Sequence, residues 1–223
     1  EIPVLVTLHL PIPWYGEALL RYRHPRLHFC CVSQSQSRTC PPQLRPYVVE
    51  NGIHLPPLAA TPSPISGREP FALVLGRICP EKNQHAALIA ATQAGLSVIL
   101  AGQVFPYPEH KAYFEDQIRP LLGRQSSGVT PTFVGPIEPS NRTALLSRAR
   151  CLLHPTLAPE TSSLVAMEAL ATGTPVIAFR SGALPDIVAE GQTGFIVGST
   201  GPMASAIHRV SRSEERRAGP PVD

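Results

Sequence analysis

Two carboxylates at a fixed spacing are the residues of this chain best suited to chemistry. Glu160 and Glu168 stand with seven residues between them. A Thr-Ser-Ser run at 161–163 follows the first glutamate, and these residue types favour the start of a helix by capping its free N–H groups. An apolar stretch comes next and ends at Gly173 and Pro175. We therefore expect one glutamate in the loop before a helix and the other inside that helix.

The geometry of this pair limits the ligands that it can hold. In one continuous helix the two carboxylates would be about 12 Å apart along the axis and about 80° apart around it. That separation is too long for one metal ion, or for the paired acids of a glycoside hydrolase, which lie about 5 to 9.5 Å apart. The helix N-terminus between them favours a phosphate. A nucleotide diphosphate sugar fits this layout. The simpler alternative is one glutamate near a cap and another on a solvated helix surface.

Two cations and a histidine extend the set of candidates. Arg77 and Lys82 follow a buried strand in the segment LGRICPEKN, where they could neutralise a diphosphate leaving group without a metal. Alternatively, each is a capping or solvated side chain. Only three Asp occur, far apart in the sequence, so a Mg²⁺-bridged phosphate site is poorly supported. His9, at the end of an N-terminal strand, would face a cleft between domains, unless it is a structural histidine.

The segments that must position these residues alternate between short apolar strands and helices. We expect strands at 4–9, 28–33, 47–49, 71–75, 97–101, 132–134, 151–154, 175–179 and 195–197. Helices fill most of the intervals, including 14–22, 82–94, 109–122, 141–149 and 203–211. This pattern predicts an α/β fold with doubly wound parallel sheets, in which ligands bind at the carboxyl ends of the strands. The candidate residues follow such ends.

Composition excludes several classes of function. A net charge of +3 over 223 residues gives no reason to expect nucleic acid as a partner. The sequence has no apolar run of transmembrane length and no GxGxxG, GxxxxGK or GxSxG motif. Its five cysteines show no metal-ligand spacing, which fits buried thiols in a reducing cytoplasm. The chain does not begin with Met and shows no signal peptide, so we expect a fragment of a cytoplasmic protein.

Several short segments together carry a resemblance to a known family. They are TLH at 7–9, VSQSQ at 32–36, ENG at 50–52, LGRICPEK at 75–82, FVG at 133–135 and ETSSLVAMEALATGTPV from residue 160. In order and spacing, from residue 4 to about residue 200, the chain resembles the retaining glycosyltransferases of family 4. The resemblance implies a GT-B fold of two facing Rossmann-like domains, of which the N-terminal one would be incomplete here.

The resemblance also implies a role for each matching residue. Glu160 would bind hydroxyls of the donor sugar and Glu168 those of the ribose, while Arg77 and Lys82 would stabilise the leaving diphosphate. His9 matches a cleft histidine near the sugar and the acceptor. The backbone around the donor would come from two further groups: Thr161, Ser162, Ser163 and Leu164 at the diphosphate, and Gly135, Pro136 and Ile137 at the base. The implied reaction transfers a hexose to an acceptor hydroxyl with retention of configuration, with no metal or other cofactor.

The resemblance and the composition together give a domain plan. We expect a partial acceptor-side domain at 1–60, a Pro-rich linker at 61–70, a donor-binding domain at 71–211 and a charged, Pro-containing tail at 212–223. The chain departs from the family where Thr161-Ser162-Ser163 replaces a Gly-Phe-Gly found in many relatives. A Cβ makes close approach to a phosphate slightly harder there.

Two other functions stay open at this point. A nucleotide-sugar epimerase of the GT-B type would bind a similar donor without an acceptor, and a truncated or inactive chain would bind the nucleotide sugar without turning it over. The acceptor, the base and the sugar are not specified by the sequence. Peripheral membrane contact of the full-length protein is also open, since many family members act on lipid-linked acceptors.

Overall fold

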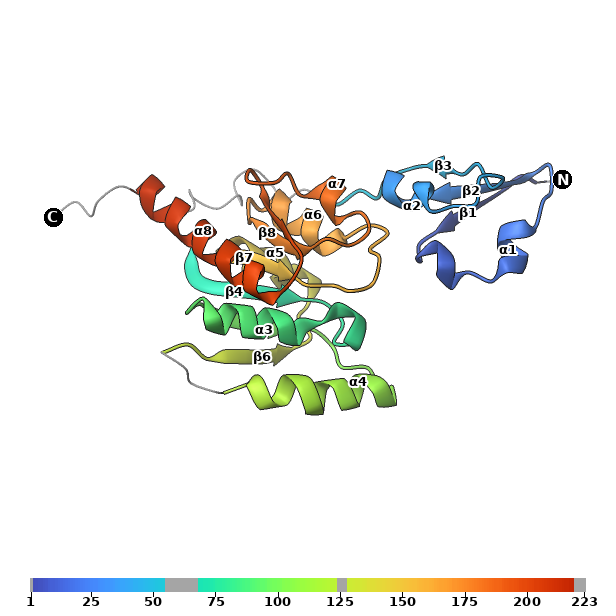
Figure 1. Cartoon of the computed structure of the whole chain (residues 1–223). Coiled ribbons are helices and arrows are strands. Elements are labelled where there is room, and N and C mark those ends of the chain that lie inside the picture. The colour runs from blue at the N-terminus through green and yellow to red at the C-terminus, as the bar shows by residue number, and fades with distance from the viewer. Residues whose placement is uncertain (1, 55–67, 124–127, 219–223) are drawn as a thin grey trace.

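The chain folds into two α/β units, each built on its own parallel sheet (Figure 1). The computed structural model describes residues 2–54, 68–123 and 128–218. The smaller, N-terminal unit holds a three-stranded sheet in the order β1-β2-β3, and the larger unit a six-stranded sheet in the order β6-β5-β4-β7-β8-β9. Every strand pair in both sheets is parallel. The expected doubly wound α/β architecture is confirmed.

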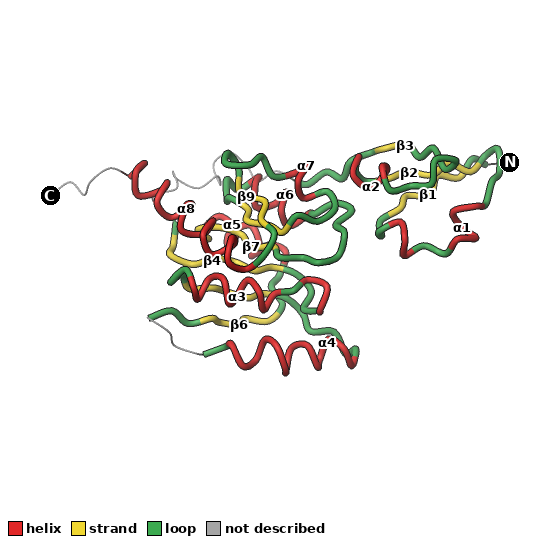
Figure 2. Tube along the Cα trace, in the orientation of Figure 1, coloured by secondary structure: helices red, strands yellow, loops and turns green. Residues whose placement is uncertain are grey.

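The larger sheet alternates with helices along the chain, as Figure 2 shows. Its strands are β4 (Glu69–Leu75), β5 (Ser97–Ala101), β6 (Pro131–Gly135), β7 (Ala149–His154), β8 (Val176–Phe179) and β9 (Gly194–Val197). Its helices are α3 (Gln84–Gln93), α4 (Pro108–Tyr113), α5 (Pro139–Arg148), α6 (Leu164–Ala171), α7 (Leu184–Ile187) and α8 (Thr200–Ala218). The chain winds outward from β4 through β5 to β6, returns to the centre at β7, and winds the other way to β9. The strand order therefore reverses between β4 and β7, which is where α/β sheets bind ligands.

Helices cover both faces of this sheet. On one face α3 and α8 pack against alternate strand residues such as Ala72 and Val74, and the other face brings α5, α6 and α7 against Phe71 and Leu73. Successive strand residues point to opposite faces, so a strand buried on both sides must be apolar throughout. This explains why the strands of this unit are continuous runs of apolar residues.

The smaller unit packs only one compact cluster. Its elements are β1 (Val4–Leu8), α1 (Glu17–Arg21), β2 (Leu27–Cys31), α2 (Gln34–Arg38) and β3 (Tyr47–Val48). Buried Gln36 ties the sheet together, because its side-chain amide donates to the carbonyls of Leu8 and Leu10 and accepts from the backbone N–H of Val32. Among the described residues, polar contacts reach the larger unit at two places: the Thr161 hydroxyl donates to the His9 carbonyl over 2.9 Å, and Arg38 pairs with Asp186 over 3.1 Å.

Three helical segments differ from the sequence expectation. The helix expected at 14–22 is a 3₁₀ turn (Ile12–Trp14) followed by α1, with Gly16 as the N-cap between them. The helix expected at 109–122 is α4 followed by a π-helical and a 3₁₀ segment (Phe114–Ile118 and Arg119–Leu121). The helix expected at 203–211 runs to Ala218, so the residues expected to open a tail at 212 continue α8. Its Glu and Arg residues are good helix formers.

The linker expected at 61–70 falls mostly outside the described residues, and its last two residues, Glu69 and Pro70, already belong to β4. Residues 219–223 of the expected tail also lie outside the described part of the chain. None of the described helices combines the length and the hydropathy that a membrane span needs.

Candidate active site

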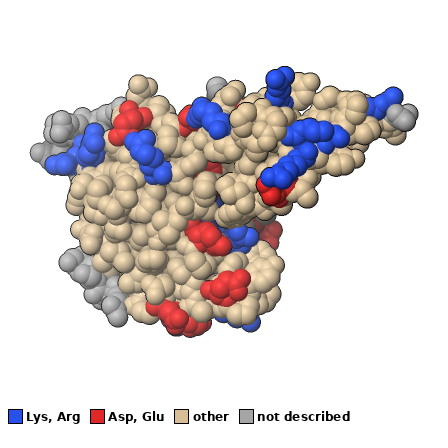
Figure 3. Space-filling view, turned by 45° about the vertical axis from the view of Figure 1, so that its right-hand side comes forward, with Lys and Arg blue, Asp and Glu red and all other residues tan. Residues whose placement is uncertain are grey.

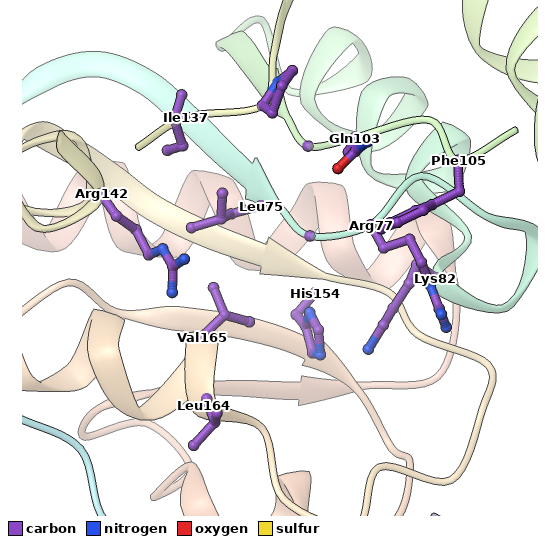
Figure 4. Close-up of a pocket in the computed structure, with 13 residues that line it drawn as sticks. Leu75, Arg77, Lys82, Gln103, Phe105, Ile137, Arg142, His154, Leu164 and Val165 are labelled. Atoms are coloured by element: carbon purple, nitrogen blue, oxygen red, sulfur yellow. The ribbon is translucent and has the colours of Figure 1, made fainter. Parts of the chain in front are cut away.

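A pocket of about 320 Å³ opens at the point where the strand order reverses, beyond the carboxyl ends of β4 and β7 (Figure 4). It combines basic side chains with an apolar wall. Its lining residues are Leu75, Gly76, Arg77, Lys82, Gly102, Gln103, Phe105, Pro136, Ile137, Arg142, His154, Leu164 and Val165. Five of the twelve residues expected at the site from the sequence are among them: Arg77, Lys82, Pro136, Ile137 and Leu164.

Lys82 reaches the site because of a local irregularity in the backbone. The sequence predicts a helix from residue 82, but Lys82 ends a 3₁₀ turn (Pro80–Lys82), and α3 begins two residues later. Asn83 between them takes a left-handed conformation with φ +53°, which asparagine tolerates better than most residues. Its side chain donates to the Pro155 carbonyl over 3.1 Å. The turn is thereby fixed against the loop after β7, and the Lys82 ammonium contacts Glu160.

Glu160 lies in the loop before α6, as expected from the sequence, and a neighbouring loop holds its backbone. The Glu160 carbonyl accepts from the Ala183 N–H over 2.7 Å, and the Ser181 hydroxyl donates to the Ala158 carbonyl over 2.6 Å. Gly182, with φ +51°, packs so closely that a Cβ there would overlap the Glu160 backbone. The loop after β8 therefore requires a glycine at this position.

A cation and a histidine surround the Glu160 carboxylate. Its side chain is only 11% exposed, it is ion-paired with Lys82, and it lies 3.5 Å from His154 Nε2. Burial alone would raise the pKa of Glu160, but the hydrogen bond and charge of His154, together with Lys82, outweigh burial and lower this pKa to about 2. Glu160 is therefore a carboxylate at any physiological pH and can accept hydrogen bonds from sugar hydroxyls.

His154 is a site residue that the sequence analysis missed. It ends β7, is buried, and lines the pocket. A polar residue at the carboxyl end of a buried strand was the signal that drew attention to His9, and the same signal applies to His154. His9 itself lies elsewhere: its side chain is exposed, its backbone carbonyl meets Thr161, and it is not among the residues that line the pocket in the described part of the chain.

The N-terminus of α6 faces the pocket with its backbone donors available. Ser163 is the N-cap, as the sequence suggests, but its hydroxyl lies 3.3 Å from His154 Nε2 and does not cap the helix. No side chain among the described residues caps this first turn. The Thr161 hydroxyl turns toward the His9 carbonyl, and Ser162 is half-buried. The N–H groups that begin at Leu164 are therefore free for an anion.

Glu168 pairs with a second residue that the sequence analysis missed. Arg142, on α5, donates to both carboxylate oxygens of Glu168 over 3.0 and 3.2 Å. Arg142 lines the pocket, whereas Glu168 lies behind it on α6. Nothing in the sequence around Arg142 marks it, because a cation on an amphipathic helix is ordinarily a solvated surface residue. The pairing depends on how α5 and α6 pack.

Glycines shape one corner of the pocket. Gly76 and Gly102 line it directly after the adjacent strands β4 and β5, and Gly135, which ends the next strand β6, is outside the lining. The Gly102 N–H donates to the Gly135 carbonyl over 2.8 Å, and a Cβ on Gly102 would overlap the Gly76 carbonyl. Pro136 and Ile137, directly after Gly135, form the far wall. This corner suits a flat ring that contacts backbone groups.

The fold defines a GT-B type α/β protein, and its pocket combines basic side chains with a buried carboxylate beside it. Residues 60–219 match the family described as glycosyl transferases group 1, which is most of the chain. The chain belongs to this family.

Curated relatives agree with this assignment but are longer than the chain. It is 31% identical over 180 residues to a phosphatidyl-myo-inositol mannosyltransferase of Propionibacterium freudenreichii, covering 78% of this chain and 44% of that protein. It is 31% identical over 222 residues to a glycogen synthase of Mycobacterium tuberculosis, covering 87% and 50%. A D-inositol 3-phosphate glycosyltransferase of Corynebacterium glutamicum is 47% identical over 74 residues, covering 33% and 18%. The chain spans half or less of these relatives.

Solved structures share the fold at low sequence identity. Anabaena HepE in complex with UDP-glucose superposes with a TM-score of 0.73 at 21% identity, covering 95% of this chain and 63% of that one. The sucrose-phosphate synthase of Thermosynechococcus elongatus gives 0.73 at 23% identity, covering 94% and 59%.

Proposed function

We propose that this chain carries the donor site of a retaining hexosyltransferase of family 4, which uses a nucleotide diphosphate sugar. The observation that carries the proposal is the cluster of Lys82, Glu160 and His154 beside the uncapped N-terminus of α6. It joins a carboxylate for sugar hydroxyls to positive groups for a diphosphate within one pocket. The relatives are named as glycosyltransferases and synthases of glycans, and HepE is bound to UDP-glucose, which supports the same class of donor.

The pocket suggests how such a donor would lie. The base would contact Pro136 and Ile137, and the ribose would reach Glu168 beside Arg142. The diphosphate would lie over the N-terminus of α6, between Arg77 and Lys82. The hexose would then meet Glu160 and His154 at the end nearest the smaller unit, where the Thr161 hydroxyl contacts His9.

The chemistry follows from this arrangement. The bond between the anomeric carbon and the diphosphate oxygen breaks, and the electron pair leaves with the nucleoside diphosphate. The acceptor oxygen forms its new bond on the same face of the sugar, and its proton passes to the departing phosphate. Arg77, Lys82 and the helix N-terminus would stabilise the charge that develops on the diphosphate, so we propose that the transfer needs no metal.

Donor binding would require an exchange of ionic partners. In the structure, Lys82 is paired with Glu160 and Arg142 with Glu168. Both carboxylates would turn to hydroxyl groups when the donor binds, and Lys82 would turn to the diphosphate. Lys82→Ala should therefore weaken UDP binding about tenfold to a hundredfold, because a charged hydrogen bond is worth about 1.5 to 3 kcal/mol. Uridine should bind equally to both proteins. Equal losses for UDP and uridine would contradict the role of Lys82.

Calorimetric titration of the chain with UDP, GDP, ADP and UDP-glucose, without added metal, tests the proposal. We expect one diphosphate to bind selectively, and Glu168→Ala to lose that binding. Glu115→Ala is the matched control, because Glu115 also pairs with an arginine, Arg119, but on an exposed surface. A folded chain that binds none of the ligands would refute the proposed donor site. For a chain that binds UDP-glucose, product analysis separates the functions: a transferase releases UDP, an epimerase releases an altered UDP-sugar, and a binding-only chain releases neither.

A further inference from the structure

A cluster of three potential metal ligands includes two residues of the loop that carries Arg77 and Lys82. One ligand atom from each of Cys79, Glu81 and His110 lies within 4.8 Å of the others. The three come from two distant segments, the loop after β4 and the helix α4. The lining of the pocket includes none of them, so the cluster is separate from the proposed donor site.

The burial of this cluster is unusual for polar groups. Cys79 is fully buried, and His110 is only 5% exposed. His110 Nδ1 is buried and has no hydrogen-bond partner among the described residues. An unpaired buried nitrogen costs about 1 to 3 kcal/mol, so it calls for a partner. Glu81 is exposed, which leaves an open side through which an ion and a water molecule can reach the cluster.

We propose that Cys79, Glu81 and His110 bind one Zn²⁺ ion. Sulfur, imidazole nitrogen and carboxylate oxygen are the three ligand types that Zn²⁺ takes in proteins, and three protein ligands leave a fourth tetrahedral position for water. Mg²⁺ prefers oxygen ligands and does not suit a thiolate. The Cys79 thiol gives its proton to solvent as the sulfur binds the metal. The ion would supply the partner that buried His110 lacks.

The ion would stabilise the loops of the proposed donor site without contacting the donor. The Glu81 carbonyl accepts from the N–H groups of Leu157 and Ala158, over 2.8 and 3.4 Å, and from the Thr156 hydroxyl over 3.2 Å. Glu81 therefore already links the loop before Lys82 to the loop before Glu160. A metal bound through its side chain would add α4 to this connection. The role is structural and independent of the metal-free transfer proposed above.

Metal binding to the whole chain tests this inference directly. The reduced protein is treated with a chelator and desalted, and then titrated with Zn²⁺, with Mg²⁺ as the comparison. Co²⁺ serves as a spectroscopic probe, because a thiolate ligand gives a charge-transfer band in the near ultraviolet. We expect one Zn²⁺ per chain, no Mg²⁺, a thiolate–Co²⁺ band, and a higher melting temperature with Zn²⁺.

Variants locate the ion. Cys79→Ser should abolish the charge-transfer band while keeping a hydrogen-bonding side chain, and His110→Gln should weaken Zn²⁺ binding by at least about tenfold. His85→Gln is the matched histidine control, since His85 is already bonded to the Tyr113 hydroxyl. Cys40→Ser tests a competing thiol site, because Cys31 Sγ and Cys40 Sγ are 3.5 Å apart.

The binding results of the variants either support the zinc site or overturn it. Binding that is lost in Cys79→Ser and weakened in His110→Gln, but kept in both controls, supports the site. A folded chain that binds no Zn²⁺, or binding lost only in Cys40→Ser, overturns it. If Cys79→Ser does not fold, His110→Gln decides alone: unchanged Zn²⁺ affinity in that variant refutes the proposal, and weakened affinity supports it.

Discussion

The two sheets of this protein are built from similar strands but are buried to different degrees. In the larger unit, helices cover both faces, and Leu73 in β4 is fully buried. In the smaller unit, Leu5 in β1 is 59% exposed and Tyr47 in β3 is 61% exposed. An apolar strand therefore indicates a sheet that can be covered on both faces, but the coverage depends on the helices that the chain supplies.

Charge is distributed differently in the two regions. On the face shown in Figure 3, Lys and Arg side chains predominate on the smaller unit, whereas the larger unit shows side chains of both charges. The larger unit places its key charges in pairs around the pocket. We infer that the larger unit carries most of the stability and the pocket.

The largest expected effect comes from a matched pair of leucines. Leu73→Ala should lower the free energy of unfolding of the larger unit by about 2 to 5 kcal/mol, because it leaves a cavity in a fully buried core. Leu5→Ala should change stability by less than about 0.5 kcal/mol. Urea unfolding can separate the units, since the only tryptophan, Trp14, reports on the smaller one and circular dichroism mainly on the larger. Equal effects of the two substitutions would contradict the comparison.

The dependence of stability on low pH tests the buried charge of Glu160 in the larger unit. The pKa of Glu160 is about 2 in the folded chain, below its ordinary value of 4.5, so the carboxylate stabilises the fold above about pH 4.5. That contribution, at most about 3 kcal/mol, is lost as the pH falls from about 4.5 toward 2. In Glu160→Gln, the free energy of unfolding should therefore change less with pH between about 4.5 and 2. Glu115→Gln should reduce this pH dependence much less, because its pair with Arg119 is exposed. Identical curves for both variants would exclude this role of Glu160.

A matched pair of glycines tests how the loop after β8 holds the site. Gly182→Ala should cost about 1 to 3 kcal/mol, because φ is +51° and the new Cβ would overlap the Glu160 backbone. It should also weaken UDP-glucose binding. Gly191→Ala has a similar strain, at φ +73°, but no described atom lies within 4 Å of its Cβ position, so donor binding should survive. Thermal melting and calorimetry measure the two effects, and equal loss of binding in both variants would contradict the proposed support.

The smallest effect is expected between the two units. Arg38 and Asp186 are 64% and 45% exposed, so Arg38→Ala should change the free energy of unfolding by less than about 1 kcal/mol. The same urea experiment measures it, with Arg21→Ala, which removes an exposed pair within the smaller unit, as the control. A larger loss for Arg38→Ala than for Arg21→Ala would mean that this contact holds the units together.

The sequence was sufficient to predict the alternating elements and the position of Glu160 before its helix. Those features depend on local patterns: apolar runs, capping residue types and a glycine stop. The partners of the site residues were not predictable in this way. Lys82 meets Glu160 through the left-handed turn at Asn83, and Arg142 meets Glu168 through the packing of two helices. Ser163 marked the start of the helix correctly, but its hydroxyl contacts His154. His154 lies on β7 and comes close to Ser163 only in the folded chain, so the sequence alone could not indicate this contact.

The ion pairs of the pocket bear on how fast an anion can bind there. Lys82 and Arg142 are each neutralised by a glutamate. These two ion pairs therefore add little to the long-range field that an approaching diphosphate meets, and their contribution to its association rate should depend little on ionic strength. Selection then happens at contact, where the proposed donor would offer hydroxyl groups to the glutamates and its diphosphate to Lys82. A bare diphosphate that lacks these hydroxyls would dissociate quickly.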